Sequence, residues 1–66
     1  MNLIEYEGKK VRILAMNGKL FEGKFTDYVY PEDNDPEVES IIIDDILSGN
    51  AVEFPEDDIK SIEIIA

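Results

Sequence analysis

The sequence contains no cysteine and no histidine. Without thiols there is neither a disulfide framework nor a thiolate zinc site, and without imidazole the commonest neutral metal ligand and acid-base group is missing. The side-chain hydroxyls other than those of tyrosine, on Thr26, Ser40, Ser48 and Ser61, therefore lack a base that would activate a nucleophile. No glycine-rich loop that would hold a phosphate is present either. We therefore expect a protein that is not an enzyme and that has no cofactor and no metal ion.

Long hydrophobic runs and basic residues are also scarce. No apolar run reaches the roughly 18 residues of a membrane span, and the N-terminal "MNLIEYEGKK" lacks the basic flank and apolar core of a signal peptide. We expect a cytoplasmic protein with no membrane partner. Six Lys and Arg against 16 Asp and Glu give a formal net charge of -10. This charge repels phosphate and disfavours nucleic acid as a general partner.

The length predicts one domain, residues 1–66. A domain of this size buries only roughly 60% of the surface that its unfolded chain exposes, so its stability is marginal. Apolar packing must hold it together, within one chain or between subunits. Because self-association would add buried surface, we expect a homo-oligomer.

The first clear pattern is a β-hairpin. From Lys9 the pattern has a period of two, as in a half-buried strand: Val11, Ile13 and Ala15 alternate with Lys10, Arg12 and Leu14. Asn17-Gly18 follows, and this dipeptide accepts the positive φ angles of a type I′ turn. Residues 19–30 are then the returning strand.

The returning strand contains a glycine between two phenylalanines. Gly23 lies on the same face as Phe21 and Phe25. A glycine inside a long strand often marks a bulge or a sharp bend, because the missing side chain lets the backbone approach a neighbour. We expect this strand to be curved.

The start of the chain carries helix signals. Asn2 precedes Glu5 by three residues, as in a capping box, and Gly8 stands where a short helix can end in a left-handed conformation. A short helix is predicted over residues 2–7. The alternative is a frayed terminus with an apolar plug.

The rest of the chain indicates short strands. Residues 30–40 carry two prolines and five acids, so we expect an exposed loop. Three further strands are predicted as "IIIDDI" (41–46), "AVEF" (51–54) and "IKSIEII" (59–65), with a turn at 48–50 and a tight helical turn at "PEDD". Ile59, Ile62 and Ile64 are available to the core. This arrangement predicts an all-β fold, a small five-stranded antiparallel β-barrel.

Two stretches carry a family resemblance. "VRILAMNGKLFEGKFTDY" resembles the first motif of the Sm-like (LSM) family, whose two glycines, apolar residue and aspartate fall here at Gly18, Gly23, Phe25 and Asp27. "AVEFPEDDIKSIEII" resembles the last two strands of that barrel, and also the C-terminal barrel of RimP-type ribosome maturation factors, where a P-x-x-D-I turn joins the strands. The resemblance covers nearly the whole chain. It implies a strongly bent barrel of the Sm-like or SH3-like type, often capped by an N-terminal helix.

The resemblance also implies assembly, because many members form rings through the edges of their fourth and fifth strands. Short apolar edge strands leave backbone groups that a neighbouring copy can pair. The candidate interface residues are Val52, Phe54, Ile62 and Ile64. The alternative is a monomer whose edge is protected by Glu53, Lys60 and Glu63.

The RNA-binding pattern of the family is only partly present. It uses an aspartate, a stacking side chain and an asparagine after the second strand, and a basic residue with glycine after the fourth. Asp27 matches and Tyr30 is placed to stack, but Pro31 replaces the asparagine, although Asn34 lies further along that loop. Pro55 and Glu56 replace the basic-glycine pair, which removes a cation and adds an acid.

Two function hypotheses follow. The first is a non-catalytic assembly module that presents an acidic surface to a protein partner. The alternative is an RNA-associated protein that binds single-stranded RNA or ribosomal components through Arg12, Lys24, Asp27 and Tyr30. Five of the six bases lie in the first two predicted strands, where they form either a phosphate-binding stripe or an ordinary solvated face.

Two acidic patterns match known sites only in part. "DNDPEVE" alternates acids like a calcium loop, but Val38 and Asp44 occupy the sixth and twelfth positions, where such a loop needs glycine and glutamate. The alternatives are a weak cation site and a solvated acidic loop. Asp44-Asp45 and Asp57-Asp58 are adjacent pairs, and neighbours on a strand point to opposite faces, so neither is an acid-base dyad.

Overall fold

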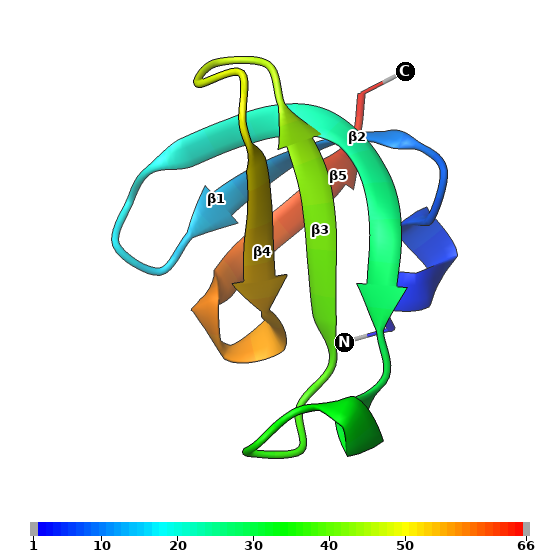
Figure 1. The fold of residues 1–66 in the computed structure, drawn as a ribbon. Coiled ribbons are helices and arrows are strands. Elements are labelled where there is room, and N and C mark those ends of the chain that lie inside the picture. Colours follow the sequence, from blue (N-terminus) through cyan, green and yellow to red (C-terminus); the bar gives the residue numbers. More distant parts are fainter. Residues whose placement is uncertain (1, 66) are drawn as a thin grey trace.

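The computed structural model describes residues 2–65 and contains one antiparallel sheet with the strand order β4-β3-β2-β1-β5 (Figure 1). The strands are β1 (Lys10–Ala15), β2 (Leu20–Val29), β3 (Ser40–Asp45), β4 (Ala51–Pro55) and β5 (Ile59–Ile64). The helices are short 3-10 helices, η1 (Leu3–Tyr6), η2 (Pro31–Asp33) and η3 (Glu56–Asp58). None of the helices in this part of the chain is long and apolar enough to cross a membrane. The five predicted antiparallel strands are confirmed.

The N-terminal segment differs from the helix predicted over residues 2–7. It forms only the four-residue 3-10 helix η1, and the Asn2 side chain makes no capping hydrogen bond. Asn2 has φ -100° and ψ 79°, outside the extended conformation typical of a capping residue. Instead Leu3 is buried, and its N–H donates to Oε1 of Glu39 at 2.9 Å. The burial of Leu3 and its hydrogen bond hold this segment in place. Gly8, which follows the segment, has the left-handed conformation that was expected, with φ +80°.

The β1–β2 hairpin is confirmed, but its predicted turn type is wrong. A type I′ turn needs positive φ at both central residues, whereas only Gly18 has one, at +88°. The Gly18 N–H donates to the Ala15 carbonyl, and the Ala15 N–H donates to the Lys19 carbonyl, both at 2.9 Å. These bonds define a three-residue loop. The Asn17 Oδ1 atom accepts the Lys19 N–H at 3.0 Å, which further stabilises the loop.

Strand β2 is long and curved (Figure 1). Gly23 pairs with Val11 of β1 on one side and with Asp45 of β3 on the other. A Cβ atom on Gly23 would collide with the carbonyl group of Asp44. The glycine therefore permits close backbone approach, as predicted, while the irregularity in strand pairing lies three residues later, at Thr26.

The core lies inside the curve of the sheet. Its buried hydrophobic residues are Leu3, Val11, Ile13, Ala15, Phe25, Ile41, Ile43, Phe54 and Ile59. Ile59 is thus in the core as expected, and Ile62 packs against it while remaining half-buried. Ile64 is 49% exposed. The end of β5 therefore contributes little side-chain burial within one chain.

The sheet is open rather than a closed barrel. Within residues 2–65, β4 pairs only with β3 and β5 pairs only with β1. The chain leaves β4 through the short helix η3, and β5 then pairs with β1 at the opposite edge of the sheet. In the described part of the chain, the side of β4 that faces away from β3 therefore has no paired strand. The molecule therefore has two edge strands, β4 and β5.

Candidate functional site

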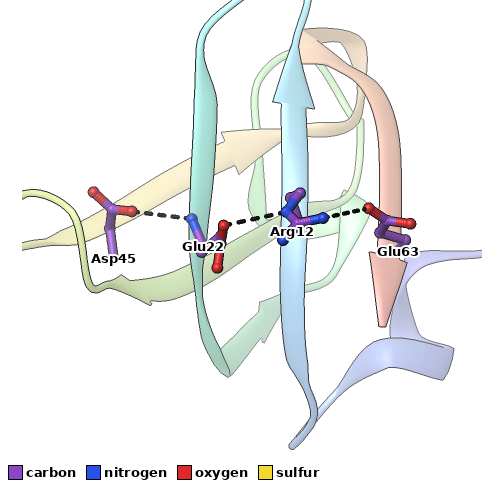
Figure 2. A network of polar contacts seen from close by, with 4 residues as sticks. All are labelled: Arg12, Glu22, Asp45 and Glu63. Atoms are coloured by element: carbon purple, nitrogen blue, oxygen red, sulfur yellow. Dashed lines mark hydrogen bonds and ion pairs between the residues drawn. The ribbon is translucent and has the colours of Figure 1, made fainter. Parts of the chain in front are cut away.

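Arg12 lies at the centre of a polar network on the outer face of the sheet (Figure 2). Its Nε donates to Oε2 of Glu22 on β2, and its Nη1 donates to Oε1 of Glu63 on β5, both at 3.2 Å. The hydrogen bond and charge of Glu22, followed by those of Glu63, raise the pKa of Arg12 above its ordinary value. The guanidinium that the alternative RNA hypothesis assigns to an RNA contact is thus already held by two carboxylates.

The network continues to Asp45, which is only 3% exposed. Its carboxylate accepts the Glu22 N–H at 3.2 Å and the Ser48 N–H at 3.0 Å. Burial is the largest single influence on the pKa of Asp45 and on its own would raise it. The hydrogen bonds that the carboxylate accepts, above all from Ser48, together outweigh burial, so the net pKa lies below its ordinary value. Asp45 is therefore ionised at neutral pH, and its hydrogen bonds connect the turn that follows β3 with strand β2.

The other predicted RNA contacts do not gather around one pocket. Lys24 is exposed on β2 and pairs with Lys10 of β1, so two like charges lie opposite each other. Asp27 is exposed beyond the irregularity in β2. Tyr30 follows the end of that strand, and its ring meets the Tyr28 ring edge-on at a centroid distance of 4.9 Å. The four candidates are thus distributed along the outer face and the far end of β2.

Glu39 joins three parts of the chain. Its Oε1 accepts the Leu3 N–H, and its Oε2 accepts the Tyr28 hydroxyl at 3.0 Å. Its backbone carbonyl accepts the Glu56 N–H at 2.8 Å. Burial, followed by the hydrogen bond to Glu39, raises the pKa of Tyr28. The position of Glu39 in the sequence indicated only a residue of the acidic loop, because its partners Leu3 and Tyr28 are distant along the chain.

The acidic loop at residues 31–39 is anchored by Asn34. Its Nδ2 donates to the Val38 carbonyl at 2.7 Å and to the Ser40 Oγ at 2.9 Å. Across residues 2–65 no three acidic side chains are placed to hold a metal ion. The alternating acids of this loop form no such group.

The four candidate interface residues differ in exposure. Phe54 is 4% exposed and lies in the core of its own chain, where its ring meets Phe21 edge-on at 4.8 Å. Val52 and Ile62 are half-buried, and Ile64 is the most exposed of the four. Among these four candidates, Ile64 is therefore the apolar side chain most accessible to a neighbouring copy.

A cavity of about 280 Å³ lies at the opening of the sheet, between β4 and the β1–β2 hairpin. Its lining residues are Ala15, Met16, Asn17, Phe21, Glu53, Phe54 and Asp58. The two phenylalanine rings and the adjacent aliphatic groups give it an apolar floor, while Glu53 and Asp58 supply carboxylates. The Met16 N–H donates to the Asp58 carbonyl at 2.9 Å and fixes the hairpin loop to η3.

A second hollow of about 240 Å³ borders the first, and both contain Glu53 and Asp58. Its lining residues are Asn34, Asp35, Pro36, Val38, Ser40, Glu53, Pro55, Asp57 and Asp58. No lysine or arginine lines either hollow. From its position in the sequence, Glu53 was predicted only to protect the β4 edge. The sequence signal for the hollows is the pair of inward-facing aromatics, Phe21 and Phe54, together with the acids that follow β4.

No protein-family model, curated protein or solved structure matches this chain. What the cavity offers chemically is an aromatic and aliphatic floor with carboxylates at its rim. Next to it runs the unpaired outer side of β4. These groups suit the binding of another chain.

Proposed function

We propose that this chain is a non-catalytic binding and assembly module of the Sm-like type, which self-associates through β4 and β5 and presents an acidic surface to a protein partner. One observation carries the proposal. The two edge strands of the sheet, β4 and β5, are the strands that the family resemblance assigns to ring contacts.

The Sm-like assignment draws support from the positions of the motif residues. Gly18 is in the β1–β2 turn, and Gly23 lies in β2 where its backbone closely approaches that of Asp44. Phe25 is in the core, and Asp27 is exposed two residues further on. Residues 55–59, the P-x-x-D-I turn of the RimP resemblance, run from the end of β4 through η3 to the start of β5. The positions of the two glycines, the phenylalanine and the aspartate support the proposed Sm-like type.

Self-association is favoured by the geometry of the edges. An unpaired edge leaves backbone N–H and C=O groups without sheet partners, and a second strand supplies them. Pairing β4 of one copy with β5 of the next is a head-to-tail contact, which generates a closed ring when the rotation between copies permits. The net charge of -10 opposes this contact by repulsion between copies. Salt screens such repulsion, so the assembly should strengthen as ionic strength rises.

The acidic surface is the second part of the proposal. The carboxylates of Glu53, Asp57 and Asp58 lie in or beside β4 and η3, around hollows without basic residues. Such a surface attracts a partner of opposite charge and repels phosphate. It supports a protein partner over RNA.

A charge on the β5 edge should weaken assembly. Ile64→Lys places a lysine at a residue that is already 49% exposed, so the fold should persist while the contact between copies is disrupted. We expect sedimentation velocity to show an oligomer for the wild type and at least about tenfold weaker association for the variant. The control is Leu47→Lys, which adds the same charge at a 66% exposed residue of the β3–β4 turn.

Circular dichroism of both variants establishes that they are folded. A wild type that stays monomeric at every protein and salt concentration would contradict self-association. Equal weakening by Ile64→Lys and Leu47→Lys would place the contact somewhere other than the β5 edge.

A further inference from the structure

We infer that the cavity between β4 and the β1–β2 hairpin binds a lysine or arginine side chain from an extended basic segment of a partner protein. The inference rests on the proposed function, because it names the chemistry of that protein partner and the place where it binds. It does not require self-association.

The floor of the cavity fits the long apolar stem of a basic side chain. Phe21 is half-buried and its ring packs edge-on against the nearly buried Phe54 ring at an interplanar angle of 69°, so Phe21 supplies most of the aromatic surface open to the cavity. Lysine and arginine bury their methylene groups along such surfaces while the charged end stays near water. An aromatic ring also attracts a cation placed over its face.

The rim of the cavity fits the charged end of the same side chain. Glu53 and Asp58 both line the cavity. Within residues 2–65, neither carboxylate makes a hydrogen bond or an ion pair in this structure. Hydrogen bonds from an ammonium or guanidinium group to a carboxylate are stronger than those between neutral groups. The cavity therefore combines an apolar stem site with two acceptors for a cation.

The second hollow explains why the occupant is a segment and not a single side chain. It shares Glu53 and Asp58 with the first hollow and adds Asp35 and Asp57. A chain that passes from one hollow to the other meets carboxylates along its path. A peptide with several basic residues would place successive cations there.

The charge of the whole chain selects the class of partner. At -10, the chain attracts a basic segment over distances of about a Debye length and repels a phosphate backbone. Arg12, which would otherwise supply a phosphate contact, is bonded to Glu22 and Glu63. A basic protein segment is thus favoured over RNA.

The test is fluorescence anisotropy with labelled peptides that alternate glycine with arginine, lysine or glutamate. The double variant Glu53→Gln and Asp58→Asn removes two cavity charges, and the control Asp33→Asn and Glu37→Gln removes two charges from the exposed loop. We expect the arginine and lysine peptides to bind and the glutamate peptide not to bind. The cavity variant should weaken binding by about tenfold and the control by less than about twofold.

A second pair of variants blocks the cavity without removing acids. Met16→Lys adds a competing cation at the exposed mouth of the cavity, while Leu47→Lys adds the same charge elsewhere. Only Met16→Lys should weaken binding strongly. Equal weakening in the matched pairs, no binding of the basic peptides, or binding of labelled oligo-uridine in their place would overturn the inference.

Sedimentation of the same samples separates the two proposals. If the protein is a monomer that binds the arginine peptide through the cavity, the result contradicts self-association and supports the basic-segment site. If it is an oligomer that binds none of the peptides, the result contradicts the basic-segment site and supports self-association.

Discussion

Asp45 is a buried acid whose carboxylate connects β2 to the turn after β3. It is buried in a protein of net charge -10, and it accepts hydrogen bonds from the backbones of Glu22 and Ser48. The sequence predicted that Asp44 and Asp45 point to opposite faces, and the structure confirms it, with Asp44 exposed. The bond to Glu22 was not predictable, because it joins residues 23 positions apart whose distance depends on the curve of β2.

The Asp45 carboxylate should make stability pH-dependent. Its pKa in the folded state lies below the ordinary value of 3.8. Ionised Asp45 therefore stabilises the fold above that value, and this stabilisation is lost as the pH falls through it towards the folded pKa. Asp45→Asn should cost about 1–3 kcal/mol at neutral pH, and the difference from the wild type should shrink as the pH is lowered from neutral to below 3.8.

Urea unfolding across this pH range measures the difference directly. Asp44→Asn is the matched control, because it removes the same charge from the exposed face of the same strand. If both variants followed the same pH dependence, Asp45 would have no special contribution to stability.

Among the elements, β2 was predicted best and the N-terminal helix worst. The glycine between two phenylalanines indicated a curved strand, since close backbone approach is a local property that one residue reveals. The type of the β1–β2 turn was wrong because Asn17-Gly18 also fits a three-residue loop, in which only Gly18 needs a positive φ. The capping signal at Asn2 failed because burial of Leu3 and its bond to Glu39 position η1.

Two glycine substitutions distinguish close approach from backbone conformation. Gly23→Ala should cost about 3 kcal/mol or more, because its Cβ would collide with the Asp44 carbonyl between paired strands. Gly18→Ala should cost about 1–2 kcal/mol, because it meets no atom and only the positive φ is unfavourable. Urea unfolding of both variants gives the two values. A smaller loss at Gly23 than at Gly18 would contradict the close approach as the reason for that glycine.

For the molecule as a whole, composition and strand pattern predicted five antiparallel strands and a surface dominated by acids. They did not predict that the sheet stays open, because this depends on where η3 directs β5. The cavity was missed for a related reason. Phe21 and Phe54 are distant in sequence and meet only when β4 lies beside the hairpin. The open sheet creates both the edges and the cavity on which the proposed function depends.

Backbone amide hydrogen exchange, measured residue by residue at low and high protein concentration, tests the proposed edge pairing most directly. Pairing between copies should slow exchange at amides of β4 and β5 as the concentration rises, while amides inside β1 and β2 stay unchanged. The concentration at which exchange slows should match the association seen by sedimentation. Exchange in β4 and β5 that does not depend on concentration, or protection confined to residues 31–39, would contradict assembly through these two strands.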